Sequence, residues 1–351
     1  MFGLLSTEIL VIVILIISWF CVSKKIEPKQ ILLACIPFAI FLIILETFRN
    51  GAINPDYNLY LQYIYFPNSH RGELEESFFN IVSIARFFNG NHITVFLIYA
   101  LLGISIKLIA IYKYSYNMIY SICVWIAFSF ILHDLIQIRA AVSAGLLLLM
   151  IPAVYKKQIY LAIFYWIIAF LFHYSSIIFG VLFILKKNEI KSWIWITGYA
   201  LIFIINATNY PIFNIVFKII SLLPGTLADR IGKSDPTLLD EMSRMTMYSR
   251  YVLIPTIFCF ASLYFNKTVK TFYPISTLCI KLCFIGIFLF GIGLPIVSER
   301  LYEILQVPMI YIVPTSLLWY HRNAVLKGKI AITVFCLFMS WNLLFKQAVF
   351  S

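Results

Sequence analysis

Residues 133–157 read HDLIQIRAAVSAGLLLLMIPAVYKK, an apolar run with Arg139 near one end and two lysines at the other. The part from Arg139 to Tyr155 has the length of a membrane-spanning helix, which needs roughly 17–25 apolar residues. The same composition extends along the chain, because 62% of the 351 residues are hydrophobic and only 12% are charged. A soluble domain carries about 25% charged residues. The sequence therefore predicts an all-α polytopic membrane protein.

The chain is expected to form a single integral membrane domain over residues 1–351, with about 12 transmembrane helices and a range of 10–12. The first run has no basic segment before it, so it is expected to be a membrane helix and not a secretory signal. Span 174–185 is short and is expected to be tilted or only partly inserted. The candidate spans are 7–22, 31–47, 92–112, 117–132, 139–155, 158–172, 174–185, 191–207, 249–266, 274–294, 301–319 and 330–347.

Lysines and arginines fall on opposite sides of this topology. Lysine pairs such as Lys156 and Lys157 follow the ends of alternate spans, and the positive-inside rule makes that side cytoplasmic. Both termini then lie outside. The net charge of +12 is explained by this asymmetry, so no nucleic-acid partner is expected. The outer arginines are residues 49, 71, 86, 139, 230, 244, 250 and 300.

Two outer segments are long, the first at 48–91 and the second at 208–249. The first closes with the amphipathic run SFFNIVSIARFF, and the second contains NYPIFNIVFKII. Both runs are expected to form helices that lie along the membrane surface.

Arginine is preferred over lysine where a planar fork must hold phosphate or carboxylate. Arg139 opens a helix close to hydrocarbon depth, where ionisable groups are costly and tend to be functional or specifically paired. Arg300 begins another helix after an outer turn. Together with Arg49, Arg250 and the neighbouring Tyr302, these arginines suit an anionic headgroup such as a lipid-linked pyrophosphate.

The alternative reading is that the outer arginines make ordinary ion pairs. Arg139 would then pair with Asp134, and surface arginines such as Arg71 and Arg86 would pair with outer acids or with lipid phosphate.

His173 and Asp56 are the candidate general bases. A histidine in AFLFHYSS, at the outer end of a span, can deprotonate a sugar hydroxyl near neutral pH. Asp56 lies in NPDYNLY, where Tyr57 and Tyr60 are candidates for stacking on sugar rings. The alternatives are a satisfied structural histidine and a turn-forming aspartate.

Several enzyme signatures are missing from the sequence. It has no GxSxG elbow, no Walker loop, no paired acids for a divalent metal and no zinc-type spacing. The seven cysteines lie inside apolar runs. An enzyme with this sequence is expected to need no metal and no cofactor, and to act by positioning and electrostatics.

The motifs occur in a familiar order. FR followed by DYNLY, then EESFFNIV, IQIRAAVSAG, FLFHYSS and SERLY resembles the Wzy/EpsG-type polysaccharide polymerases of O-antigen, capsule and exopolysaccharide assembly. By this resemblance Arg49, Asp56, Tyr60, Arg139, His173 and Arg300 occupy motif positions. Ala140 stands where the family often has Gln, and Ser77 where it often has Pro. These differences leave open whether Glu75 or Glu76 is the acid of this motif. Glu76 is taken as the candidate ligand.

The resemblance implies a glycosyltransferase that transfers a growing glycan from undecaprenyl pyrophosphate to the next lipid-linked repeat unit. It also implies an active face on the periplasmic side of a bacterial inner membrane, and a pathway that includes a flippase and a chain-length regulator. Two other functions stay open. A flippase for lipid-linked oligosaccharide predicts internal repeats and interrupted helices, which are not visible. An O-antigen ligase would share the pyrophosphate chemistry, so only its product separates it from a polymerase.

Overall fold

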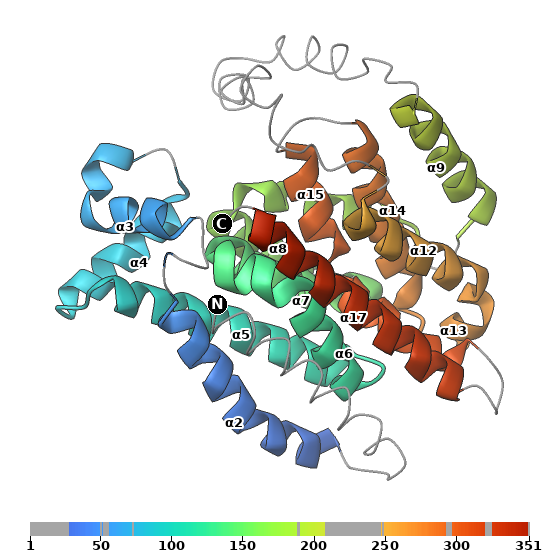
Figure 1. Ribbon diagram of the computed structural model, residues 1–351, viewed down its shortest axis with the longest axis horizontal. Coiled ribbons are helices and arrows are strands. Elements are labelled where there is room, and N and C mark those ends of the chain that lie inside the picture. Colours follow the sequence, from blue (N-terminus) through green and yellow to red (C-terminus); the bar gives the residue numbers. More distant parts are fainter. Residues whose placement is uncertain are drawn as a thin grey trace. The chain divides into compact units, whose positions relative to one another are not determined.

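The computed structural model describes residues 28–49, 51, 56–71, 74–187, 190–207, 247, 249–292, 297–319 and 325–349 (Figure 1). Every regular element in these residues is a helix and none is a strand, which confirms the predicted all-α class. The expected first span at 7–22 and the expected surface helix NYPIFNIVFKII lie outside the described residues, as do Arg230 and Arg244.

The chain divides into two compact units, residues 1–184 with 310–351, and residues 185–309. In its described residues the first unit contains twelve elements, and it carries most of the predicted site. They are α2 (Pro28–Thr47), α3 (Tyr57–Tyr65), η1 (Pro67–His70), α4 (Glu76–Phe87), α5 (His92–Tyr114), α6 (Met118–Trp125), η2 (Ile126–Ile136), α7 (Ile138–Tyr155), α8 (Ile159–Phe172), η3 (Tyr174–Phe183), η5 (Val313–Leu318) and α17 (Val325–Val349). The short α16 (Met309–Ile312) begins at the last residue of the second unit.

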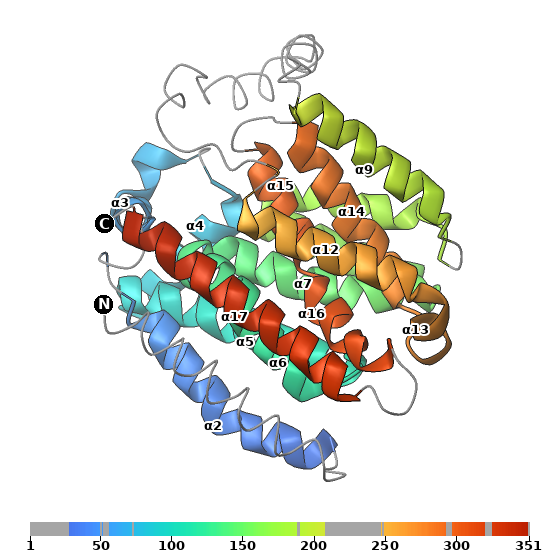
Figure 2. The ribbon, with the colours of Figure 1, turned by 45° about the vertical axis from the view of Figure 1, so that its right-hand side comes forward.

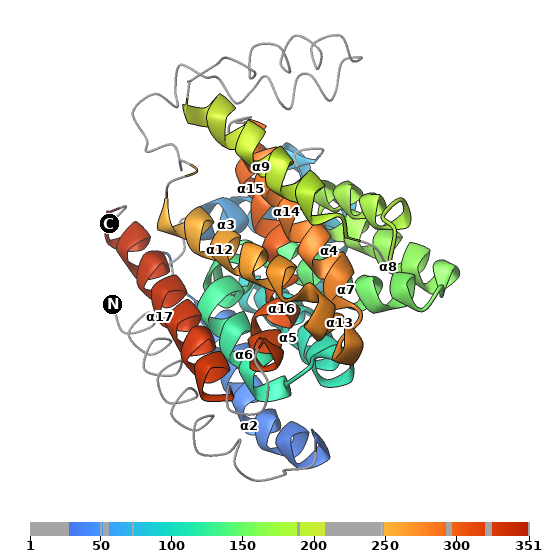
Figure 3. The same cartoon turned by 90° about the vertical axis from the view of Figure 1, so that its right-hand side faces the viewer.

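Helix α7 is the central helix of the first unit. It is buried over most of its length and packs against α5 and α8 (Figure 3). A Cβ on Gly145 would lie 2.8 Å from Cγ2 of Ile106, so the glycine permits α5 and α7 to approach closely. The Tyr311 hydroxyl lies 3.1 Å from each of the carbonyls of Ala110 and Leu148, which ties α5 to α7.

A π-helix, η2, leads directly into α7. Its 11 residues run from Ile126 to Ile136, and the N–H of Gln137 donates to the carbonyl of Leu132 at 3.0 Å, a spacing of five residues. Such wide turns are rare and are often found at functional sites. The chain turns at Gln137 and begins α7 at Ile138, so Arg139 lies in the first turn of α7.

Helix α4 is the helix predicted for SFFNIVSIARFF. Phe78, Phe79 and Val82 are buried, whereas Ile84 and Phe87 on the other face are 52% and 82% exposed. An exposed apolar face suits a helix at a membrane surface. That membrane position stays a prediction.

The helices described in the second unit are α9 (Ser192–Ala207), α12 (Arg250–Tyr264), α13 (Asn266–Phe272), α14 (Ser276–Ile292) and α15 (Val297–Gln306). Helix α9 packs along α14 (Figure 2). The rings of Trp195 and Phe288 stack between these helices with centroids 5.7 Å apart. Between α12 and α13 the chain bends by 77°.

Four helices of the described residues are long and apolar enough to cross a membrane, or five if α12 and α13 form one broken span. The long ones are His92–Tyr114, Met118–Ile136, Ile138–Tyr155 and Ser298–Leu318. Each expected span other than 7–22 coincides with helical residues, although several of these helices have only 10–17 residues. The chain is thus a multi-pass membrane protein, whereas twelve crossings stay a prediction.

Candidate functional site

Three segments that are distant in the sequence converge on the carboxylate of Glu75. One is the start of α4, which carries Glu75 itself. The second is the start of α7, whose Arg139 donates from Nη1 to Glu75 Oε2. The third is the joint between α8 and η3, where the backbone N–H of Tyr174 donates to Glu75 Oε1 at 2.9 Å and Nδ1 of His173 lies 3.5 Å from the same oxygen. Glu75, Arg139, His173, Tyr174 and the adjacent Tyr60 are called the Glu75 cluster below.

The amphipathic pattern of α4 turns Glu75 into the protein. Glu75 precedes the helix in an extended conformation, with φ −65° and ψ 139°. It shares the buried face with Phe78, Phe79 and Val82, at the spacing of an amphipathic helix. The Ser77 hydroxyl donates to the carbonyl of Leu171 and so fixes the start of α4 against the end of α8. The Glu75 side chain is only 3% exposed as a result.

Arg139 retains a donor that Glu75 does not use. Its side chain is 16% exposed, and its guanidinium carbon lies 6.0 Å from the centre of the Tyr60 ring. Among the residues that the structure describes, no acceptor meets the buried Nε of Arg139. This Nε is out of contact with solvent, so a bound anion would reach the side chain through the part that is exposed.

His173 stands where one helix ends and another begins. It follows α8, precedes η3 and adopts an extended conformation, with φ −156° and ψ 113°. The N–H of Tyr174 is one of the first N–H groups of η3, which have no partner within their own helix. Glu75 therefore accepts from a helix N-terminus, and its distance of 3.5 Å from His173 is an ion-pair contact longer than an ordinary hydrogen bond.

The charges around Glu75 favour its ionised form. Burial alone would raise the pKa of Glu75, but the contact with His173, the positive charge of Arg139 and the N–H of Tyr174 outweigh it and lower the pKa to about 2. In Tyr60 burial dominates, and the pKa of the phenol is raised even though Arg139 partly opposes it. The cluster thus holds a carboxylate and a neutral phenol near neutral pH.

The depressed pKa of Glu75 predicts a loss of stability in acid. A carboxyl with a pKa lowered from 4.5 to about 2 stabilises the fold above pH 4.5, and this stabilisation is lost as the pH falls from 4.5 towards 2. This difference in pKa corresponds to roughly 3 kcal/mol of stability. We expect the melting temperature of the purified protein to fall more steeply over this range in the wild type than in Glu75→Gln. Parallel curves for the two proteins would contradict the prediction.

The other predicted ligands of the first outer segment flank the cluster. Asp56 precedes the first residue of α3 and is half-buried. Tyr57 is half-buried and its ring centroid lies 5.7 Å from that of Phe96. Glu76 points the other way from Glu75, because it is exposed and pairs with Arg71 at 3.8 Å. The structure therefore brings Glu75 into the cluster and leaves Glu76 at the surface.

The alternative pairing of Arg139 with Asp134 is wrong. Asp134 Oδ1 lies 2.6 Å from Nζ of Lys107, while Arg139 pairs with Glu75. Lys107, which the predicted topology places towards the inner end of span 92–112, has a fully buried side chain that pairs with Asp134. A lysine side chain in a helix leans towards the N-terminus, which in α5 is the direction of Asp134.

The surface arginines divide between two kinds of partner. Arg71 pairs with the acid Glu76, as the alternative reading expects. Arg86 instead donates from Nη2 to the carbonyls of Ile64 and Tyr65, at 2.6 and 3.1 Å, and so links α4 to the end of α3.

Arg250, Arg300 and Tyr302 belong to the second unit. Arg250 is the first residue of α12, Arg300 lies in α15, and both are exposed. Tyr302 is fully buried, and its hydroxyl donates to the carbonyl of Tyr251 at 3.0 Å. Their roles in binding stay predictions, and so does the role of Arg49, which is described with its neighbours below.

Residue pattern alone would have distinguished Glu75 from Glu76. The buried residues of α4 continue backwards to position 75 at helical spacing, whereas position 76 falls on the exposed face with Ile84 and Phe87. In the described part of the chain, no group of three or more His, Cys, Asp or Glu side chains gathers as metal ligands would.

The comparison with family models returned a match to the EpsG family over residues 31–350. The comparisons with curated proteins and with solved structures returned no match.

Proposed function

Because the chain belongs to the EpsG family of polysaccharide polymerases, we propose that it extends a surface polysaccharide such as O-antigen by joining lipid-linked repeat units. The donor would be a glycan on undecaprenyl pyrophosphate, and the acceptor the next lipid-linked unit. The observation that carries the proposal is the convergence of Arg139, His173 and Glu75 in one cluster. In this proposal Arg139 binds phosphate, His173 is the general base, and Glu75 orients both side chains.

Arg139 is proposed to bind the pyrophosphate of the donor. Transfer breaks the bond between the anomeric carbon and the pyrophosphate oxygen, so negative charge develops on the leaving group. A guanidinium held in place before the reaction stabilises that charge without reorganising. Its Nη1 is fixed by Glu75, and the side chain keeps 16% of its surface exposed for contact with a phosphate oxygen.

His173 is proposed to accept the proton of the acceptor hydroxyl. Its Nδ1 faces Glu75 at 3.5 Å, and Nε2 is the atom proposed to take the proton. A carboxylate beside one ring nitrogen fixes the orientation of the ring and stabilises the imidazolium that forms. The hydroxyl oxygen then bonds to the anomeric carbon as the pyrophosphate leaves, and its proton passes to Nε2. Asp56 is the second candidate base.

The cluster is proposed to lie on the periplasmic face of the bacterial inner membrane. Support comes from the charge asymmetry, because the lysine-rich connectors are on the opposite side from Arg139 and His173 in the predicted topology. The enzyme is proposed to work without a metal or other cofactor, beside a flippase and a chain-length regulator of the same pathway.

Surface glycans from a strain lacking the gene test the proposal. With a polymerase missing, the ladder of chain lengths should collapse to a single repeat unit on its anchor, and the wild-type gene should restore it. Loss of the single repeat as well would instead place the block at export or attachment, and so favour a flippase or a ligase.

A further inference from the structure

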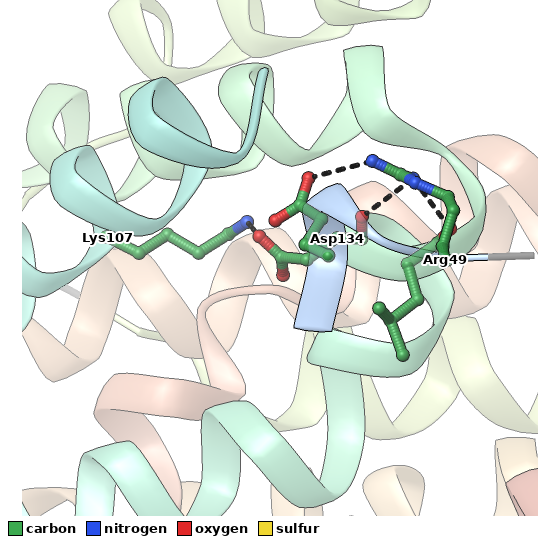
Figure 4. A network of polar contacts seen from close by, with 5 residues as sticks. Arg49, Lys107 and Asp134 are labelled. Atoms are coloured by element: carbon green, nitrogen blue, oxygen red, sulfur yellow. Dashed lines mark hydrogen bonds and ion pairs between the residues drawn. The ribbon is translucent and has the colours of Figure 1, made fainter. Parts of the chain in front are cut away.

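A second group of charges lies inside the first unit, apart from the Glu75 cluster. Glu46 near the end of α2, Arg49 just after it, Lys107 of α5 and Asp134 of η2 are all buried (Figure 4). Nζ of Lys107 lies 2.6 Å from Asp134 Oδ1, and Nη2 of Arg49 lies 3.4 Å from Glu46 Oε1. We call these four residues the buried charge network.

Fold stability alone is a poor reason for such a network. The network brings together two acids and two basic groups, and any of them that is charged loses its hydration when buried. Replacing a buried ion pair with well-packed apolar residues is often neutral or stabilising. Charged groups inside membrane helices are accordingly rare and tend to be functional.

The network holds the end of η2 from two directions. Nη1 of Arg49 donates to the carbonyl of Leu135 at 2.8 Å and lies 3.3 Å from that of Asp134. The last carbonyls of a helix have no partner within it, so this guanidinium caps η2. The Asp134 carboxylate is held by Lys107 on one oxygen and by the indole N–H of Trp125, at 3.1 Å, on the other.

The held segment is adjacent to the proposed pyrophosphate ligand. Asp134 and Leu135 precede Arg139 by five and four residues, and Gln137 alone separates η2 from α7. Gly103 leaves room for the contact, because a Cβ there would lie 3.4 Å from Asp134 Oδ1 and 3.3 Å from Cβ of Ala141 in the first turns of α7. Movement of the end of η2 would therefore shift the start of α7.

We infer that the buried charge network positions Arg139, with Arg49, Lys107 and Asp134 acting through the η2–α7 junction and not on the substrate. The inference rests on the proposed function, because it takes Arg139 as the pyrophosphate ligand. Arg49 is then a positioning residue, whose guanidinium donates to backbone carbonyls at the end of η2. A misplacement of about 1 Å at a site of this kind can cost roughly 100-fold in rate.

The test separates positioning from stability. In purified full-length protein, the double variant Lys107→Met/Asp134→Leu removes one ion pair and leaves an apolar contact. We expect its melting temperature to stay near that of the wild type, because the removal of two buried charges offsets the loss of an acceptor for the indole N–H of Trp125. We also expect inhibition of polymerisation by inorganic pyrophosphate to weaken by roughly 10- to 100-fold. An unchanged inhibition constant in a folded double variant would overturn the inference.

A second variant covers failure of the first to fold. Arg49→Lys keeps the charge, but one ammonium cannot contact the η2 carbonyls and Glu46 together, as Nη1 and Nη2 of the arginine do. It too should weaken pyrophosphate inhibition. The matched control is Tyr311→Phe, which removes a buried hydrogen-bonding group between α5 and α7. It should lower the melting temperature and leave the inhibition constant unchanged. Equal effects of Arg49→Lys and Tyr311→Phe on that constant would contradict positioning.

Arg139→Lys distinguishes failure of the inference from failure of the proposed function. If pyrophosphate inhibits the wild type and Arg139→Lys relieves it, while both network variants behave as the wild type, only the inference fails. If Arg139→Lys leaves inhibition unchanged, the proposed ligand itself is wrong and the inference fails with it.

Discussion

Arg139→Lys is expected to lower polymer formation roughly 100-fold or more, although the positive charge is kept. A lysine ammonium is a compact point charge, whereas the guanidinium is a rigid fork that can hold Glu75 and a phosphate oxygen together. Nη1 of Arg139 is bound to Glu75 and its Nε meets no acceptor among the described residues. Lysine has a single donor nitrogen, so it cannot bind Glu75 and a phosphate oxygen in the same geometry.

The measurement is the length distribution of surface glycan from a strain whose only copy carries Arg139→Lys. Arg71→Lys is the matched control, because it makes the same change at an exposed arginine that pairs only with the surface acid Glu76 among the contacts described. The control should give a normal ladder. Near-normal polymer from Arg139→Lys, at equal protein level, would count against the pyrophosphate ligand.

The helices could be predicted from the sequence because apolar runs of this length have few other structures. In lipid every backbone N–H and C=O must find a partner within the protein, so each run becomes a helix. Even the short run at 174–185 was identifiable as unusual, and the structure makes it the 3-10 helix Tyr174–Phe183. A 3-10 helix rises about 2 Å per residue, so ten residues reach further than an α-helix of the same length.

Arg139 and His173 were identifiable because a lone polar residue in an apolar run stands out. Their convergence on Glu75 was not, since it depends on how α4, α7 and α8 pack. The choice between Glu75 and Glu76 could have been made from the helical periodicity of α4, which places only the first on the buried face.

The pairing of Lys107 with Asp134 could not be deduced from position along the spans. Lys107 lies seven residues from the end of α5, while Asp134 lies near the far end of η2. If both segments were regular α-helices that cross a membrane, Lys107 and Asp134 would be expected at different depths in it. The π-helical geometry of η2 and the reach of the lysine side chain bring the two together, and neither has a clear signal in the sequence.

His173→Gln is expected to reduce transfer by roughly 100- to 10,000-fold while the lipid-linked substrate still binds. Glutamine has a similar size and keeps hydrogen-bonding groups near Glu75, but it cannot accept a proton at neutral pH. Single-turnover assays with purified protein and a lipid-linked donor and acceptor separate the two steps, because binding should stay near normal while product formation stops.

His70→Gln is the matched control, since the ring of His70 packs edge-on against Tyr63 at 5.1 Å and belongs to the short helix Pro67–His70, outside the cluster. It should retain full transfer. Glu75→Gln should resemble His173→Gln in part, because it removes the carboxylate that orients the imidazole and fixes Arg139. If His173→Gln keeps normal turnover and Asp56→Asn loses it, the base is Asp56. The imidazole would then serve only to hold Glu75 at the start of α4.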